Sequence, residues 1–335
     1  MIREFHQIDL SGRNSFGVGQ QAARLAEFET EEDLRTIFSG GVPERWAVLS
    51  GGNNILFTRD YDGLLLTPVA RQITPLGEEG DTVRVRADAG VEWDDRGMGR
   101  GTRPVGNRKP FAHTRQLGAA PVQNIGAYGC EAKDVIERVH MFCTDNRSAM
   151  VIDAGHRCFG YRESIFKHEL RGRVIITAVD IRLRARRGRG WATATWSVRS
   201  KPAAESRCAT SAKRSAPSAA PSFSDPKVTG NAGSFFKTRS WTSAWRGSCR
   251  PSGPTCRFTR RRDAGRVKLA AGWLIDKAGL KGYKRGRVGV HERQALVLVN
   301  LGGATGGEVI DFAHTVQMRV HEKFGIEIDT EVNIF

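Results

Sequence analysis

The stretch from Gly230 to Lys237 (GNAGSFFK) constrains this chain more than any other. Two glycines let the main chain turn tightly and approach another group closely, and the bulky pair Phe235-Phe236 calls for burial. Between them lies a single hydroxyl, on Ser234, which such a loop would hold in a shaped and partly buried place. A serine in that setting can transfer a proton to a reacting carbon. A glycine-rich turn anchored by two core phenylalanines is the alternative, and both interpretations stay open at this point.

The net charge of +16 over 335 residues would ordinarily suggest a nucleic-acid partner. Its distribution indicates otherwise. Residues 96–117, 190–224 and 238–261 together hold 17 lysines and arginines and one acidic residue, Glu205, so the rest of the chain is neutral. We call these stretches the three basic segments. They lack hydrophobic periodicity, and we therefore keep a basic nucleic-acid-binding protein only as an alternative.

The remaining composition favours a globular protein of the cytoplasm. No run approaches the roughly 18 apolar residues of a membrane span, and the first residues hold no apolar signal core. The six cysteines show no CxxC or Cys/His metal spacing, so we expect free thiols and no metal site.

Hydrophobic patterns predict alternating strands and helices. Thr30 with Asp33 resembles a capping box for a short helix ending near Phe38, and a longer helix should end at Gly325. A helix is also expected over 267–278. The expected strands lie at 22–28, 47–49, 55–57, 82–87, 135–142, 174–183, 294–300 and 326–334.

Three further stretches suit ligand contacts. Residues 50–54 form a glycine turn between two strands, which could bind an anion through its N–H groups or could be a plain hairpin. The small residues and amides of 118–129 suit close approach to a flat or phosphorylated ligand. Arg162 lies among aromatic residues, where it could bind a carboxylate or form a structural ion pair. No GxGxxG opens a helix after a strand, so a Rossmann site is not expected.

Seven motifs occur in one order and cover the whole chain except the three basic segments. Together they closely resemble the UDP-N-acetylenolpyruvoylglucosamine reductase family. The motifs are SGGNNILF, PVQNIGAYG, FGYRESIFK, GNAGSFFK, AAGWLID, HERQALVLVN and EVN.

The resemblance implies an α+β fold: a vanillyl-alcohol-oxidase-type (PCMH) FAD-binding domain followed by a smaller α/β substrate-binding domain. The implied boundaries are 1–185, with two subdomains, a connecting segment at 186–224, and 225–335. It also implies non-covalent FAD, NADPH as co-substrate, a UDP-sugar substrate, a monomer, no nucleic-acid or membrane partner, and a role in peptidoglycan precursor synthesis. A related FAD-dependent oxidase with another substrate is the alternative within this fold.

Matching the motifs residue by residue assigns roles. Ser234 would deliver the proton, and Arg162 and Glu331 would stabilise the developing enolate. Tyr161, Lys237 and Gln294 would contact substrate. The implied FAD contacts are Gly51, Gly52, Asn53, Asn54, Ile55, Gly118, Ala119, Gln123, Asn124, Gly126, Ala127, Tyr128 and Gly129.

The three basic segments read like shifted reading frames. Residues 108–116 (RKPFAHTRQ) permit codons that give ENLSLIPGS one nucleotide later, which is the loop that the family uses for the flavin pyrophosphate. Residues 190–196 (GWATATW) similarly permit LGYGDL, and the stretch from Thr238 permits NPVVD. The family's diphosphate-binding tyrosine, lysine and asparagine fall within these segments, with Thr238 in place of the asparagine. We therefore expect weak binding of FAD and UDP-sugar by the chain with the present sequence.

Overall fold

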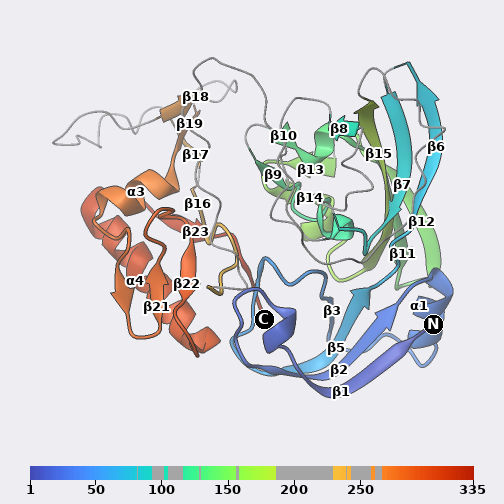
Figure 1. Cartoon of the computed structure of the whole chain (residues 1–335), viewed down its shortest axis with the longest axis horizontal. Helices are drawn as coiled ribbons and strands as arrows, with labels where there is room; N and C mark the ends of the chain where they lie inside the picture. The colour runs from blue at the N-terminus through green and yellow to red at the C-terminus, as the bar shows by residue number, and fades with distance from the viewer. Residues whose placement is uncertain are drawn as a thin grey trace, which may run out of the picture.

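The structure is a computed structural model. It describes residues 1–80, 82–92, 102–104, 116–127, 130–155, 158–185, 229–238, 240–242, 258–260 and 266–335. Most residues of the three basic segments lie outside these ranges. The prediction of shifted reading frames therefore falls on residues that are not described. Figure 1 shows two sheets at the N-terminal side of the molecule and a smaller group of helices and strands at the C-terminal side.

The N-terminal sheet mixes antiparallel and parallel pairs in the order β1-β2-β5-β3. Its strands are Arg3–Asp9, Gln21–Phe28, Tyr61–Pro68 and Trp46–Val48. Helix α1 (Glu31–Ile37) begins with the expected capping box, in which Thr30 accepts from the Asp33 N–H and Asp33 bonds back. Leu34 on this helix and Phe38, which directly follows it, are fully buried against the sheet, which fixes α1 in place.

A six-stranded antiparallel sheet follows, in the order β12-β11-β15-β7-β6 with β8 also paired to β15. One face carries valines and isoleucines that form a continuous core. Arg86 and Asp180 pair across the other face. The strands are β6 (Ile73–Glu79), β7 (Thr82–Asp88), β8 (Thr102–Pro104), β11 (Ile136–Cys143), β12 (Ser148–Asp153) and β15 (Val174–Ala185).

Short elements between β8 and β15 lie beside this sheet. Among the described residues they comprise two small hairpins and three 3-10 turns, and a fourth 3-10 turn, η1, lies between β1 and β2. The hairpins are β9–β10 (Gly126–Ala127, Cys130–Glu131) and β13–β14 (Phe159–Gly160, Glu163–Ser164); the turns are η1 (Ser11–Arg13), η2 (Leu117–Ala119), η3 (Ala132–Asp134) and η5 (Ile165–Lys167).

The C-terminal part is built around α4 (Gly306–Phe324), which Thr305 caps and Gly325 ends at φ +64°. Helix α3 (Ala271–Lys277) packs beside it. One three-stranded meander consists of β20 (Lys284–Arg285), β21 (Val288–Val290) and β22 (Leu298–Asn300). A second three-stranded group consists of β17 (Ser240–Thr242), β18 (Phe258–Arg260) and β19 (Arg266–Leu269). The remaining pair is β16 (Phe236–Thr238) with β23 (Ile328–Thr330).

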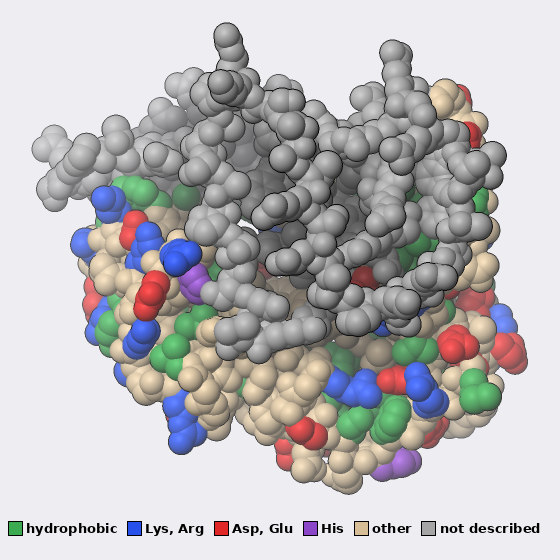
Figure 2. All heavy atoms as spheres, viewed as in Figure 1, with side chains coloured by type: hydrophobic (Ala, Val, Ile, Leu, Met, Phe, Trp, Pro, Cys, Tyr) green, Lys and Arg blue, Asp and Glu red, His purple; other side chains and the backbone are tan. Residues whose placement is uncertain are grey.

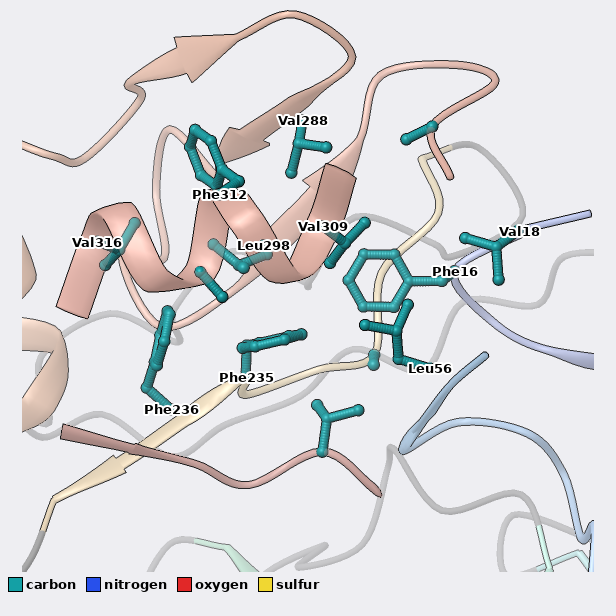
Figure 3. Close-up of a cluster of buried hydrophobic side chains, with 14 of the residues drawn as sticks. Phe16, Val18, Leu56, Phe235, Phe236, Val288, Leu298, Val309, Phe312 and Val316 are labelled. Carbon is teal, nitrogen blue, oxygen red and sulfur yellow. The ribbon is translucent and has the colours of Figure 1, made fainter. Parts of the chain in front are cut away.

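One hydrophobic core joins the two ends of the chain. Phe16 meets Phe235 edge to face at 6.1 Å between ring centroids, and Leu56 and Val309 belong to the same buried cluster (Figure 3). In addition, β4 (Ile55–Leu56) pairs in parallel with β24 (Asn333–Ile334). The segments that precede these two strands, residues 50–54 and the segment with Glu331, are therefore held close together.

Three expected elements differ from the structure. Residues 267–278 are not one helix, because β19 occupies 266–269 before α3 begins at Ala271. Only Leu298–Asn300 of the expected strand 294–300 is a strand, since His291 organises the preceding residues into a turn. The last expected strand is divided into β23 and β24, which pair with β16 and β4, respectively.

Candidate active site

The glycine turn at residues 50–54 is not a hairpin. Strand β3 before it pairs with β5, whereas β4 after it pairs with β24, so the two flanking strands belong to different sheets. Gly52 takes φ +65°, and a Cβ there would lie 2.1 Å from the Arg13 carbonyl oxygen. Only glycine fits this position, because both the left-handed backbone and the close approach exclude a side chain.

This turn meets the second loop expected to bind the cofactor. Asn54 Nδ2 donates to Gln123 Oε1 at 3.0 Å, and Ser50 Oγ donates to Gln116 Oε1 at 2.5 Å. Gly118 packs on Ala89, whose Cβ would lie 2.5 Å from a Cβ at residue 118. The structure thus brings the 50–54 turn and the 116–127 loop to one place.

Ser15 is a residue that the sequence reasoning did not single out. Its N–H donates to Gly52 O at 2.9 Å, and its carbonyl accepts from Asn231 N–H at 2.9 Å. It therefore lies between the 50–54 turn and the Ser234 loop. The Ser15 Oγ is buried with no hydrogen-bond partner among the described residues. A buried hydroxyl without a partner at this junction fits a site that takes a polar ligand.

The Ser234 loop is anchored on both sides. At its start, a Cβ at Gly230 would lie 2.2 Å from the Phe16 carbonyl oxygen. At its end, Phe235 N–H donates to Leu296 O at 2.8 Å, and both phenylalanines are buried. Ser234 itself is half-buried, and no described residue hydrogen-bonds its hydroxyl. The loop is therefore both a turn on core phenylalanines and a support for an available hydroxyl.

Arg162 and Glu331 form the central ion pair, with Nε 3.2 Å from Oε1. Arg162 also donates from Nη2 to Gly126 O at 2.7 Å, which ties the pair to the 116–127 loop. Only 9% of the Glu331 side chain is exposed, against 22% for Arg162. Water screens such a pair weakly, so the carboxylate holds the guanidinium in one orientation.

Main-chain bonds connect this pair to the other loops. Glu331 N–H donates at 2.8 Å to the carbonyl oxygen of Phe235, the residue that directly follows Ser234. Glu331 O accepts from Asn54 Nδ2 at 3.3 Å. The three residues expected to be catalytic, Ser234, Arg162 and Glu331, thus lie on segments that bond to one another and to the 50–54 turn.

The expected substrate contacts are spread more widely. Lys237 Nζ lies 3.6 Å from Oε1 of Glu163, and Glu163 directly follows Arg162 in the sequence. Gln294 belongs to the turn in which His291 Nδ1 accepts from the Gln294 N–H at 3.2 Å, and Leu296 in that turn bonds to Phe235. Tyr161 is 38% exposed. The structure therefore places Lys237 and Gln294 on segments that adjoin the Ser234 loop.

Several expected cofactor residues are used by the fold. Asn124 is 1% exposed, and its amide donates to Glu131 Oε2 and Gly160 O and accepts from Lys133 N–H. Its side chain thus supports the loop, and its main-chain N–H donates to Pro121 O at 3.2 Å, so Asn124 is used by the fold. Ile55 packs against the shared core. Tyr128 and Gly129 lie outside the described residues, as do the side chains of Ala127 and Thr238; Asn53 and Ala119 are half-buried.

Charged groups gather around Arg162. Burial lowers the pKa of Lys167, and the neighbouring Lys237 and Arg162 lower it further, whereas Glu163 and Glu331 raise it.

Within the described part of the chain, no group of three or more His, Cys, Asp or Glu side chains is placed to hold a metal.

Comparison with known proteins identifies the family. The chain is 39% identical to the UDP-N-acetylenolpyruvoylglucosamine reductase of Chromobacterium violaceum over 338 residues, covering 97% of this chain and 96% of that protein. The identity with the Pseudomonas aeruginosa protein of the same name is 36%, with 96% of each chain covered. The chain belongs to the UDP-N-acetylenolpyruvoylglucosamine reductase family. Residues 225–335 also match the family model described as the C-terminal domain of this reductase.

The fold agrees with this reductase family. A crystal structure of UDP-N-acetylenolpyruvylglucosamine reductase (MurB) from Thermus caldophilus matches with a TM-score of 0.62 at 19% identity, covering 100% of this chain and 99% of that one. The expected α+β class, with a PCMH-type FAD-binding fold and a second domain, is thereby confirmed. The chain is an oxidoreductase by family. None of the described helices is long and apolar enough to cross a membrane.

The surface bears on the nucleic-acid alternative. On the face shown in Figure 2, lysines and arginines alternate with acidic side chains over the described residues, without a continuous basic area. A nucleic-acid-binding surface ordinarily gathers its cations on one face. The described part of this face gives that alternative no support.

Proposed function

We propose that this chain reduces the enolpyruvyl group of UDP-N-acetylglucosamine enolpyruvate to give UDP-N-acetylmuramate, a precursor of peptidoglycan. The reductant would be NADPH, the cofactor non-covalent FAD, and the location the cytoplasm, where the chain acts as a monomer. The observation that carries the proposal is the Arg162–Glu331 ion pair, with Nε 3.2 Å from Oε1, bonded through Glu331 to the residue after Ser234.

The residues present fit FAD at the junction of two loops. The 50–54 turn and the 116–127 loop, which Asn54 and Gln123 join, would hold it. The buried Ser15 hydroxyl, which lacks a partner among the described residues, supports a polar ligand at this junction. When bound, FAD would supply hydride-transfer chemistry between NADPH and the enolpyruvyl group.

Ser234 would supply the proton. Hydride addition to the terminal carbon leaves electron density at the carbon that bears the ether oxygen, and a proton must reach that carbon. The Ser234 hydroxyl is half-buried and has no hydrogen-bond acceptor among the described residues, so its proton is available to a substrate. A positioned acid of this kind typically contributes about 10²–10⁴-fold in rate.

Arg162 would stabilise the charge that develops at the substrate carboxylate. Its guanidinium is already oriented by Gly126 O and Glu331, so little reorganisation is needed when charge appears. Glu331 acts on this view by holding Arg162 rather than by meeting the enolate directly. Lys237, Tyr161 and Gln294 would bind other parts of the UDP-sugar.

Anaerobic spectroscopy tests the proposal. The purified chain is loaded with excess FAD, mixed with NADPH, and then given the enolpyruvyl substrate. Loss of flavin absorbance with NADPH and its return with substrate, with UDP-N-acetylmuramate formed, would support the proposal. Bleaching by NADPH that oxygen reverses and the enolpyruvyl substrate does not would instead indicate a related oxidase. Salt-sensitive DNA binding without flavin would indicate the nucleic-acid alternative.

A further inference from the structure

The turn that carries Arg162 has an unusual backbone. Tyr161 and Arg162 connect the paired residues Gly160 and Glu163, and Arg162 takes φ +56°. Residues other than glycine rarely adopt this left-handed conformation, because Cβ crowds the adjoining carbonyl oxygen. Strained positions of this kind persist only where the surroundings hold them. The question is therefore which contacts hold Arg162.

Lys167 reaches back to this turn. Its Nζ donates to the Arg162 carbonyl oxygen at 3.4 Å. Lys167 ends the 3-10 turn η5, which Ser164 caps by accepting from Phe166 N–H at 3.2 Å while its hydroxyl donates to Val122 O. Phe166 is 6% exposed and lies in the core of the second sheet. The base of the Lys167 side chain is therefore fixed, and its ammonium group is directed at the Arg162 main chain.

The charges around Lys167 agree with this arrangement. Arg162, Glu163, Lys237 and Glu331 all interact with it electrostatically, and Lys237 Nζ lies 3.6 Å from Glu163 Oε1. Two carboxylates thus face three cations, which leaves one positive charge in excess beside the site. Among these three cations, Lys167 is the one that hydrogen-bonds the main chain of Arg162, the residue with the strained backbone.

We infer that Lys167 is a positioning residue, which holds Arg162 in its left-handed conformation so that the guanidinium can reach Glu331 and Gly126. Without it, the turn would relax toward an ordinary backbone conformation and the Arg162 side chain would leave its place. The importance of Lys167 for the reaction rests on the proposed function. Its stabilisation of the turn does not depend on that function.

A double-mutant cycle read by hydrogen exchange tests this inference in the full chain without flavin or substrate. Lys167→Met should lower the protection of the peptide 159–167 by about 10-fold, because the strained turn is then free to relax. Arg162→Gly removes the backbone strain, because glycine adopts positive φ freely. In the Arg162→Gly background, Lys167→Met should therefore change protection by less than about 3-fold.

Two further variants control the cycle. Lys323→Met also removes a lysine-to-carbonyl bond, from Lys323 Nζ to Lys277 O, but on the far helix; it should leave peptide 159–167 unchanged. Lys167→Arg keeps the positive donor and should recover most of the protection. Protection of α4 reports whether each variant is folded.

Three results would overturn the inference: unchanged protection in Lys167→Met, an equal loss in both Arg162 backgrounds, or no recovery in Lys167→Arg. Turnover measured in parallel separates this inference from the proposed function. If wild-type chain loaded with FAD fails to reduce the enolpyruvyl substrate but the cycle shows the expected coupling, the function is wrong and the positioning role stands. If turnover occurs, Lys167→Met should lower kcat/KM about 10-fold or more, and Lys323→Met should not.

Discussion

Arg162 and Glu331 are paired at 3.2 Å although one belongs to the turn between β13 and β14 and the other follows β23 near the end of the chain. The shared core of Phe16, Leu56 and Phe235 makes this possible, because it joins the N-terminal and C-terminal parts. The ion pair therefore depends on the docking of the two parts, and so does the site.

The first prediction concerns Ser234, in a version of the chain whose three basic segments are replaced by those of the Chromobacterium violaceum relative. In Ser234→Ala, flavin reduction by NADPH should be nearly unchanged, because that step needs no proton at the substrate carbon. Reoxidation by the enolpyruvyl substrate should slow by about 10²–10⁴-fold. Ser234→Cys should recover part of the rate. Stopped-flow absorbance resolves both steps, and equal slowing of the two would show that the serine is structural.

The second prediction concerns the ion pair. Glu331→Gln keeps the shape of the side chain but removes the charge that orients Arg162, so reoxidation by substrate should slow by about 10–100-fold, as for other lost charge-assisted bonds. Glu292→Gln is the matched control, since it breaks an exposed pair in which Lys284 Nζ lies 3.1 Å from Glu292 Oε1. Stopped-flow measurement of the same version would contradict the proposed role if both variants reoxidise alike.

The third prediction concerns acid stability. Asp180 is 3% exposed and lies 2.8 Å from Arg86 Nε and 3.0 Å from His140 Nε2. Burial raises the pKa of Asp180, but Arg86 and His140 outweigh this effect and hold it below its ordinary 3.8. The carboxylate should therefore stabilise the fold fully above the pKa of the unfolded chain, and this stabilisation should disappear as the pH falls through the lower folded value.

Asp180→Asn should accordingly lower the free energy of unfolding at pH 7 by about 1–3 kcal/mol and reduce its loss below about pH 4. Urea unfolding at several pH values measures both effects. Asp153→Asn, which breaks the exposed pair with Arg138 at 3.0 Å, is the control and should change little. If Asp180→Asn follows the wild-type pH profile, Asp180 does not carry the acid dependence.

The fourth prediction concerns binding by the chain with the present sequence. It lacks the pyrophosphate loop and the diphosphate contacts that the family resemblance implies, and each charge-assisted bond is worth about 1.5–3 kcal/mol. FAD and UDP-sugar should therefore bind far more weakly than they bind to the version with replaced segments. Titration followed by flavin fluorescence measures the difference, and equal affinities would refute it.

The fifth prediction concerns the gene. Resequencing should find compensating insertions or deletions near codons 95 and 117 and flanking 185–224 and 238–262. The reason is that shifted readings of these segments restore family motifs and rejoin intact ones. A DNA read that reproduces the present frame throughout, with matching peptide masses, would reject this explanation.

Local chemistry accounts for the elements that were predicted well. The capping box at Thr30 and Asp33, the end of α4 at Gly325, and strands β2, β7, β11 and β15 lie where the pattern placed them, because each depends on neighbours in sequence. The helix expected over 267–278 was wrong at its start, because β19 pairs there with β17 and β18, which periodicity within one segment cannot show.

The sequence by itself determined the family, the glycines that turns require, and the residues available for chemistry. Only the tertiary structure decided that the 50–54 turn joins two different sheets, that Asn124 is used within the fold, and that Ser15 and Lys167 adjoin the site. The physical reason is that glycine conformation and capping are local properties of a few consecutive residues. Pairing, burial and a shared core depend on residues far apart in the chain, which meet only when it folds.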